Sequence, residues 1–293
     1  VNLNRNFPDR FDVPPVNSPD GREPETQAAW YFQEAHTIVM GANYHSGALV
    51  ANVPWDAITP LAAPGQTYAP DDAAFIQFAE GYTWRNQSLW NGGWYHGWTR
   101  GWEWYQIWGG LQDWAYHWYG EHHITLEISN SQPPPYSQMD AYWDNNRAAM
   151  LWWMGRTLTG ARGLVTDACT GAPLDATVDV LEIGKAVPTD PDVGDYHRLL
   201  LPGTYTLVAS APGYPSQSAT VTVVDGPATV VDSALAGGSL YTVQGTVSEA
   251  GSGLPLAATV EVLGTALAVD TDPATGHYAL ELCPGTYTLR ASA

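Results

Sequence analysis

Apolar residues follow two different patterns in the two halves of the chain. Residues 37–44 form a near-continuous apolar run, which is typical of a strand buried on both faces of a sheet, and residues 124–126 form a second, shorter strand. Residues 26–34, 71–81 and 140–153 have the composition and end signals of helices. This alternation of strands with helices predicts an α/β fold for the first half.

From residue 160 onward the pattern changes to alternating apolar and polar positions. Val, Thr, Ala, Gly and Pro dominate, and turn residues recur about every 8–12 positions, which is the pattern of a β-sandwich. Residues 163–211 are repeated in residues 245–293, and both copies contain PGTYTL. We therefore expect three parts: residues 1–158, a sandwich of residues 160–236, and a second, truncated copy of residues 240–293.

The net charge limits which classes of molecule the protein can bind. The formal net charge is −19 and Lys185 is the single lysine. The chain therefore lacks the basic patch that binding to nucleic acid or to an anionic membrane surface requires. No apolar run approaches the length of a membrane span. The two cysteines, Cys169 and Cys283, leave both the redox compartment and their own pairing open.

Four polar or charged residues are candidates for a functional site. His45 and Glu127 each end a predicted strand, and catalytic side chains favour the carboxyl ends of strands in an α/β sheet. Each also has an ordinary explanation, since a strand-end histidine is more often a satisfied polar residue than a metal ligand, and a strand-end glutamate is usually solvated. Arg5 taken alone is a surface charge, and Asp56 taken alone is a turn aspartate.

The order of six segments changes these odds, because a series of motifs is far more specific than any one of them. The segments are NLNRNFP (2–8), PET (24–26), HSGALVANVPWD (45–56), WYQIWGGLQDWAY (104–116), ITLE (124–127) and YWDNN (142–146). Together they resemble the C-terminal half of the catalytic domain of zinc metallocarboxypeptidases, of the subfamily that contains carboxypeptidases D, E, M and N. The β-repeats resemble the transthyretin-like domains that follow it. The resemblance implies a partial α/β domain, with a mixed sheet and helices on both faces, followed by all-β transthyretin-like sandwiches.

The resemblance also implies roles for single residues. His45 matches the third zinc ligand, and a neutral imidazole suits zinc. Glu127 matches the general base that takes a proton from water. Asn4 and Arg5 match the pair that grips the free C-terminal carboxylate of a peptide or protein substrate, which a planar guanidinium binds bidentately. Tyr105 matches the mobile tyrosine that closes over the same carboxylate.

Two further positions bear on specificity. Asp56 matches the subfamily's aspartate at the base of the pocket for the leaving residue, and a buried carboxylate there selects Lys or Arg by charge. Gln112 stands just before Asp113, where the family also sets the character of the pocket. Together they imply removal of a basic C-terminal residue, and the subfamily implies secretion.

Departures from the family pattern limit this interpretation. No His-x-x-Glu occurs in the chain, and the chain begins at Val1 inside a motif. We therefore expect it to be a fragment that lacks two zinc ligands and is inactive by itself. Asn2 stands where the family usually has Asp, which orients a ligand histidine. We interpret the neighbouring His122 and His123 as solvated strand-edge residues whose side chains face opposite ways.

Two alternatives remain open at this point. Five tryptophans could form a stacking platform for sugars or peptides, which would make the chain an inactive peptidase-like binding module. A zinc deacylase or cell-wall peptidase of the same fold is the other alternative, and it would not depend on Asp56 for a preference for arginine. The five tryptophans of the first alternative are Trp90, Trp94, Trp98, Trp102 and Trp104.

Overall fold

The computed structural model describes residues 1–11, 16–58, 67–237 and 240–293. They divide into two compact units. Unit 1 consists of Val1–Thr166, Ala172–Pro212 and Ser216–Leu235, and unit 2 of Asp167–Gly171, Gly213–Pro215 and Ala236–Ala293.

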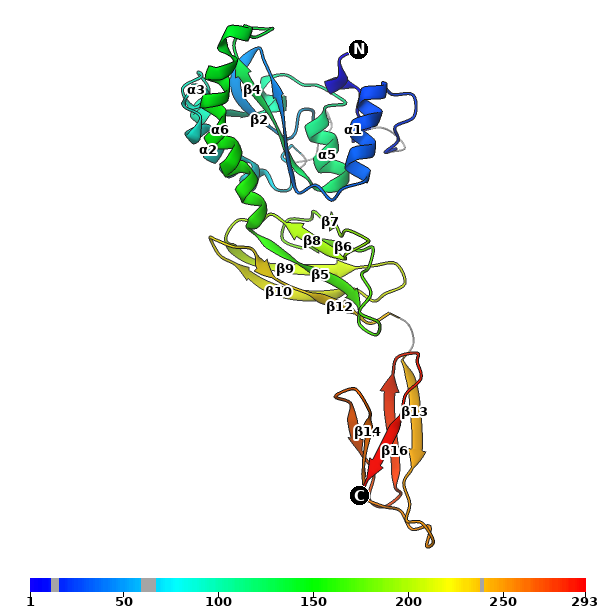
Figure 1. Ribbon diagram of the computed structural model, residues 1–293. Coiled ribbons are helices and arrows are strands. Elements are labelled where there is room, and N and C mark those ends of the chain that lie inside the picture. Colours follow the sequence, from blue (N-terminus) through cyan, green and yellow to red (C-terminus); the bar gives the residue numbers. More distant parts are fainter. Residues whose placement is uncertain (12–15, 59–66, 238–239) are drawn as a thin grey trace. The chain divides into compact units, whose positions relative to one another are not determined.

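A mixed sheet organises the first part of unit 1 (Figure 1), and its described strands are ordered β1-β4-β2-β3. Strand β4 pairs in parallel with β1 and antiparallel with β2, and β2 pairs in parallel with β3. Mixed strands and helices confirm the α/β prediction. The strands are β1 (Met40–His45), β2 (Ala48–Val53), β3 (Trp98–Arg100) and β4 (His122–Ser129).

Helices cover both faces of this sheet: α2 and α6 lie on one side in Figure 1, and α1 and α5 lie on the other. Phe75 and Tyr82 of α2 join Ile124 and Leu126 of β4 in one apolar core. Burying each large apolar side chain stabilises the fold by about 1.5–3 kcal/mol. The helices are α1 (Pro24–Glu34), α2 (Asp72–Arg85), α3 (Gln87–Trp90), α4 (Gly101–Trp104), α5 (Leu111–Tyr119) and α6 (Met139–Gly155), with 3₁₀ turns η1 (Leu3–Arg5), η2 (Tyr95–Gly97), η3 (Tyr136–Gln138) and η4 (Arg156–Leu158).

Helix α6 packs on the core through Met150, Trp152 and Trp153, whereas Met139 and Met154 are exposed. The first residues form the 3₁₀ turn η1, in which the side chain of Asn2 accepts a hydrogen bond from the backbone N–H of Asn4 and caps the turn.

The β-rich segment of unit 1 contains two sheets, ordered β10-β9-β6-β7 and β11-β5-β12, with β8 paired to β5. Burial alternates along β5 and β8, as the period-2 pattern predicted. A buried ion pair between Arg198 of β8 and Asp71 before α2, at 2.8 Å, joins this segment to the first part of unit 1. The strands are β5 (Ala161–Asp167), β6 (Thr177–Val180), β7 (Val187–Pro188), β8 (Asp195–Arg198), β9 (Gly203–Ser210), β10 (Gln217–Val223), β11 (Thr229–Val230) and β12 (Ser233–Leu235).

Unit 2 contains a pair of strands, β13 and β16, and a sheet ordered β15-β14-β17. A disulfide joins Cys169 and Cys283 within this unit, which answers the pairing question that the sequence left open. Among the described residues, no helix combines the length and apolar character needed to cross a membrane. The strands are β13 (Tyr241–Thr246), β14 (Thr259–Val262), β15 (Ala268–Asp270), β16 (His277–Leu282) and β17 (Leu289–Ser292).

Candidate active site

The carboxyl ends of β1 and β4 bring His45 and Glu127 together. The two strands are parallel, and their register places His45 opposite Glu127 and Asn43 opposite Thr125. His45 Nδ1 lies 4.0 Å from Glu127 Oε1. Burial and the nearby Arg5 lower the pKa of His45, while burial raises the pKa of Glu127. A neutral imidazole therefore stands beside a carboxylate that binds protons more readily than usual.

Loop segments add the other predicted residues. Asn4 and Arg5 come from η1, and the side-chain oxygen of Asn4 accepts a hydrogen bond of 2.8 Å from the backbone N–H of Leu111 at the start of α5. The exposed Arg5 donates to the carbonyl oxygen of Asn4 at 2.7 Å. Tyr105 follows α4 directly and is about half exposed. Its ring packs edge-on against that of Trp104.

Asp56 is the most deeply buried of the predicted residues, at 1% exposure. Its Oδ1 accepts hydrogen bonds of 2.9 Å from both Asn52 Nδ2 and Gln112 Nε2. Its Oδ2 is buried and has no hydrogen-bond partner among the described residues. Burial raises the pKa of Asp56 to about 7, although the hydrogen bond from Asn52 and the charge of Arg5 act in the opposite direction.

Two glycines make room for this carboxylate. A Cβ atom at Gly101 would lie 2.1 Å from Asp56 Oδ1, and one at Gly110 would lie 2.7 Å from Asp56 Oδ2. Either distance is shorter than a real contact, so any larger residue would displace the carboxylate. The position of Asp56 therefore requires glycine at residues 101 and 110.

A cavity of about 260 Å³ unites these side chains. Gln112 does not line the cavity, because it is fully buried behind Asp56, to which it donates. The cavity is lined by the other six predicted residues, Asn4, Arg5, His45, Asp56, Tyr105 and Glu127.

Further residues of this site were missed in the sequence. Asn52 and Thr125 line the cavity, and Asn43 lies 2.8 Å from the imidazole of His45 through its side-chain nitrogen. Asn43 and Thr125 stand two positions before His45 and Glu127, so the period of a strand already put them on the same face. Gln132, which also lines the cavity, comes from the loop after β4, and no sequence pattern pointed to it.

The interpretation of His122 and His123 as solvated residues was wrong. They are only 1% and 7% exposed, because β4 lies between β1 and β2 rather than at an edge. Their side chains do face opposite ways: His122 stacks on Phe75 in the core, whereas His123 contacts Glu121 at 2.7 Å. Neither residue lines the cavity.

The five tryptophans of the alternative interpretation do not share one exposed surface. Each is partly buried, and they pack on different neighbours. Trp90 stacks on His96, Trp94 packs edge-on against Trp104, and the indole N–H of Trp98 donates to Glu80. This arrangement favours packing and loop rigidity over a stacking platform.

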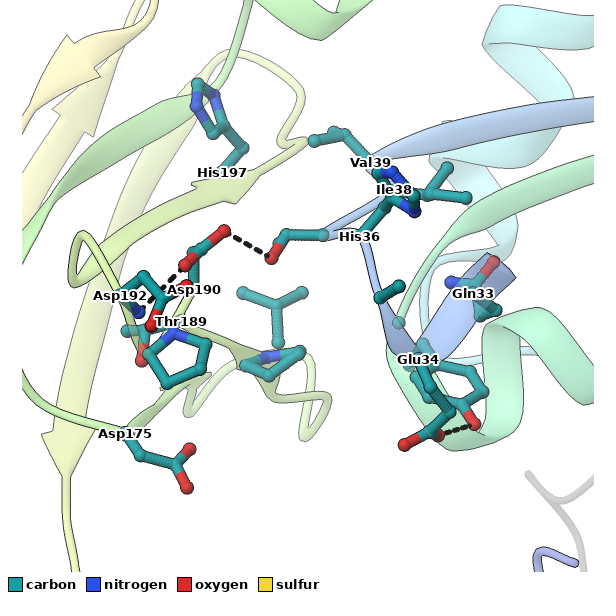
Figure 2. A pocket seen from close by; sticks show the side chains of 17 residues that line it. Gln33, Glu34, His36, Ile38, Val39, Asp175, Thr189, Asp190, Asp192 and His197 are labelled. Carbon is teal, nitrogen blue, oxygen red and sulfur yellow. Dashed lines mark hydrogen bonds between the residues drawn. The ribbon is translucent and has the colours of Figure 1, made fainter. Parts of the chain in front are cut away.

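A larger cavity, of about 440 Å³, lies elsewhere in unit 1. Figure 2 shows carboxylates and imidazoles around it, among them Glu34, Asp190, His36 and His197. Thr37 Oγ1 donates to Asp190 Oδ2 at 3.5 Å across it. None of the predicted site residues lines this cavity, so size alone does not identify the chemical site.

Comparison with known proteins identifies the family of the chain. Residues 1–149 match the model of the zinc carboxypeptidase family, and residues 160–236 match that of the carboxypeptidase regulatory-like domain. Carboxypeptidase D of Mus musculus is 38% identical over 234 residues, which cover 75% of this chain and 16% of that protein. Carboxypeptidase SOL1 of Arabidopsis thaliana is 39% identical over 225 residues, which cover 75% of this chain and 45% of that protein.

The catalytic chain of human carboxypeptidase N is 36% identical over 253 residues, which cover 78% of this chain and 55% of that protein. The chain therefore spans between about a sixth and about half of the length of these relatives. A match to half of the chain, together with relatives of this identity, confirms the predicted resemblance. The chain belongs to the zinc carboxypeptidase family, whose members depend on zinc and act on peptides or proteins.

Proposed function

We propose that the protein is a zinc-dependent carboxypeptidase that hydrolyses the C-terminal peptide bond and prefers Lys or Arg as the leaving residue. The observation that carries this preference is the buried carboxylate of Asp56, whose Oδ2 has no partner among the described residues. Asn52 also lines the cavity, and its Oδ1 is likewise buried and unpartnered within the described structure. These two acceptors suit a cationic side chain that carries several N–H donors.

The residues present fit one side of a zinc site. His45 supplies a neutral imidazole, the form that binds zinc, and Glu127 lies beside it. Zinc, when bound, would polarise the scissile carbonyl and acidify a water molecule. Glu127 would take the proton of that water, since its Oε2 is buried without a partner among the described residues and its pKa is raised by burial.

The substrate's free carboxylate would be held by Arg5, Asn4 and Tyr105. Arg5 forms no ion pair with any described carboxylate, so its guanidinium is available for a bidentate contact. Asn4 is fixed by Leu111 at 2.8 Å. Because a carboxypeptidase must recognise a chain end, a cation and a half-exposed tyrosine that line the same cavity as Glu127 support this proposal.

The proposal is tested with two peptides that differ only in the last residue, Arg or Ala. We expect the product of the complete reading frame that contains this chain to release Arg faster, and to lose this activity when zinc is chelated. Equal release of Arg and Ala would refute the basic preference, and release that survives chelation would refute the zinc mechanism.

The preference for Arg is expected to weaken in acid. The pKa of the Asp56 carboxyl is raised to about 7 by burial, so the pocket loses its negative charge as the pH falls below that value. The ratio of kcat/KM for the Arg peptide to that for the Ala peptide should fall up to about tenfold per pH unit below pH 7. Protonation of Glu127 lowers kcat/KM for both peptides alike, so their ratio reports the protonation of Asp56 alone. A ratio that stays constant down to about pH 5 contradicts this assignment.

The 293-residue chain by itself is expected to be inactive. A catalytic zinc site uses three protein ligands, and the described residues contain no group of three or more His, Cys, Asp or Glu that could hold a metal ion. Purified chain incubated with zinc and the Arg peptide should release no more Arg than its Glu127→Gln variant does. Release above that control contradicts the expectation.

We also propose three parts, residues 1–158, 160–236 and 240–293, the last two with transthyretin-like topology, and a secreted location. The match of the regulatory-like domain over residues 160–236 supports the second part. The disulfide between Cys169 and Cys283 supports secretion, because disulfides persist in oxidising compartments.

A further inference from the structure

Four side chains form a square on the face of the sheet that lines the site. Asn43 and His45 belong to β1, Thr125 and Glu127 belong to β4, and the register places each pair side by side. Thr125 Oγ1 donates to Asn43 Oδ1 at 2.8 Å. Asn43 Nδ2 lies 2.8 Å from His45 Nε2, and His45 Nδ1 faces Glu127. The hydrogen bonds thus run in one line from Thr125 to His45.

This line ties the tautomer of His45 to the orientation of the Asn43 amide. Because the hydroxyl of Thr125 donates to the amide oxygen, the amide presents its N–H₂ group to His45. An N–H donor requires a bare nitrogen at Nε2, so the proton of the neutral ring stands on Nδ1. Nδ1 is also the nitrogen that faces the site, and a nitrogen that carries a proton does not bind a metal ion.

We propose that Asn43 and Thr125 form a reversible positioning relay that sets the tautomer of His45. In the arrangement seen here the relay holds the proton on Nδ1. Rotation of the Asn43 amide by about half a turn exchanges its oxygen and nitrogen at unchanged positions. His45 Nε2–H then donates to the amide oxygen, the amide nitrogen donates to Thr125, and Nδ1 is bare. The number of protons is the same in both states, since one proton moves from Nδ1 to Nε2 through solvent.

A primary amide has a donor and an acceptor at opposite ends of one short planar group, so Asn suits this place whereas an ionised Asp or a Leu does not. Thr125 completes the relay because its hydroxyl both donates and accepts. It is buried, at 4% exposure, which protects the bond to Asn43 from competing water. The inference rests on the proposed role of His45 as a zinc ligand, but its test uses neither zinc nor substrate.

The test is the nitrogen NMR spectrum of the chain labelled with ¹⁵N-histidine, recorded at about pH 8, where imidazoles are neutral. In the wild type we expect the Nδ1–H tautomer at His45. In Asn43→Asp the carboxylate only accepts, so the tautomer ratio should invert in favour of Nε2–H, by at least about tenfold. Thr125→Val and Asn43→Leu should each move the ratio in the same direction, since each removes the bond that keeps Nε2 bare.

His36 is the internal control. Its Nδ1 lies 2.8 Å from the carbonyl oxygen of Phe32, so it should keep its Nδ1–H tautomer in every variant and show that the end of α1 is unchanged. An Nε2–H tautomer in the wild type, or an unchanged ratio in Asn43→Asp or Thr125→Val with His36 intact, overturns the proposal. A protein without carboxypeptidase activity would still give either result, so failure of the relay and failure of the proposed function are distinguishable.

Discussion

Release of C-terminal arginine by an Asp56→Asn variant is expected to fall by about two to three orders of magnitude in kcat/KM, while release of C-terminal alanine stays within about threefold. The reason is burial: Asp56 is 1% exposed and Oδ2 has no other partner among the described residues, so a guanidinium in the pocket would face an amide instead of a charge. Leaving one member of a buried ion pair unmatched costs about 3–5 kcal/mol.

The matched control is Asp192→Asn, which removes the same charge from an exposed carboxylate that lines the other cavity. It tests whether the acidity of the chain as a whole attracts cationic peptides. We expect it to leave both peptides unaffected at physiological ionic strength, where exposed charges are screened within about 8 Å. Equal losses for the Arg and Ala peptides in Asp56→Asn would show that the residue supports the fold rather than reads the leaving residue. An unchanged kcat/KM for both peptides would show that the pocket for the leaving residue lies elsewhere.

A Glu127→Gln variant is expected to lose about 10²–10⁴-fold in kcat for every peptide, with little change in KM. The amide keeps the size of the side chain and its place on β4, but it has no basic oxygen to accept the proton of water. The raised pKa of Glu127, which burial causes, makes the ionised carboxylate a stronger base than an exposed glutamate. The measurement is kcat and KM for the Arg and Ala peptides.

Glu25→Gln is the control for this variant, because Glu25 is an exposed glutamate in the first turn of α1. It should behave as the wild type. A Glu127→Gln variant that keeps more than about a tenth of the activity contradicts the role of general base. A variant that loses only affinity would instead place Glu127 among the residues that bind substrate.

The sequence alone determined the family, the two strands that end at the site, and the helices α1, α2 and α6. The apolar run before His45 and the short strand before Glu127 predicted two strands, and their parallel pairing is what joins the two residues. The motifs also named six side chains that one cavity now unites. They did so because the series of motifs resembles the family, which implies a role at each matching position. Local pattern alone marked only His45 and Glu127, which each end a predicted strand.

Only the tertiary structure decided where β4 lies in the sheet and what surrounds each charge. Strand order depends on contacts between distant segments, so the sequence allowed His122 and His123 to be edge residues, whereas β4 lies between β1 and β2 and buries both. The burial of Asp56 Oδ2 without a partner among the described residues, the hydrogen bond between Thr125 and Asn43, and the disulfide each require residues far apart in the chain to meet. Burial and hydrogen-bond partners set pKa values and tautomers, and these arise only when the segments pack.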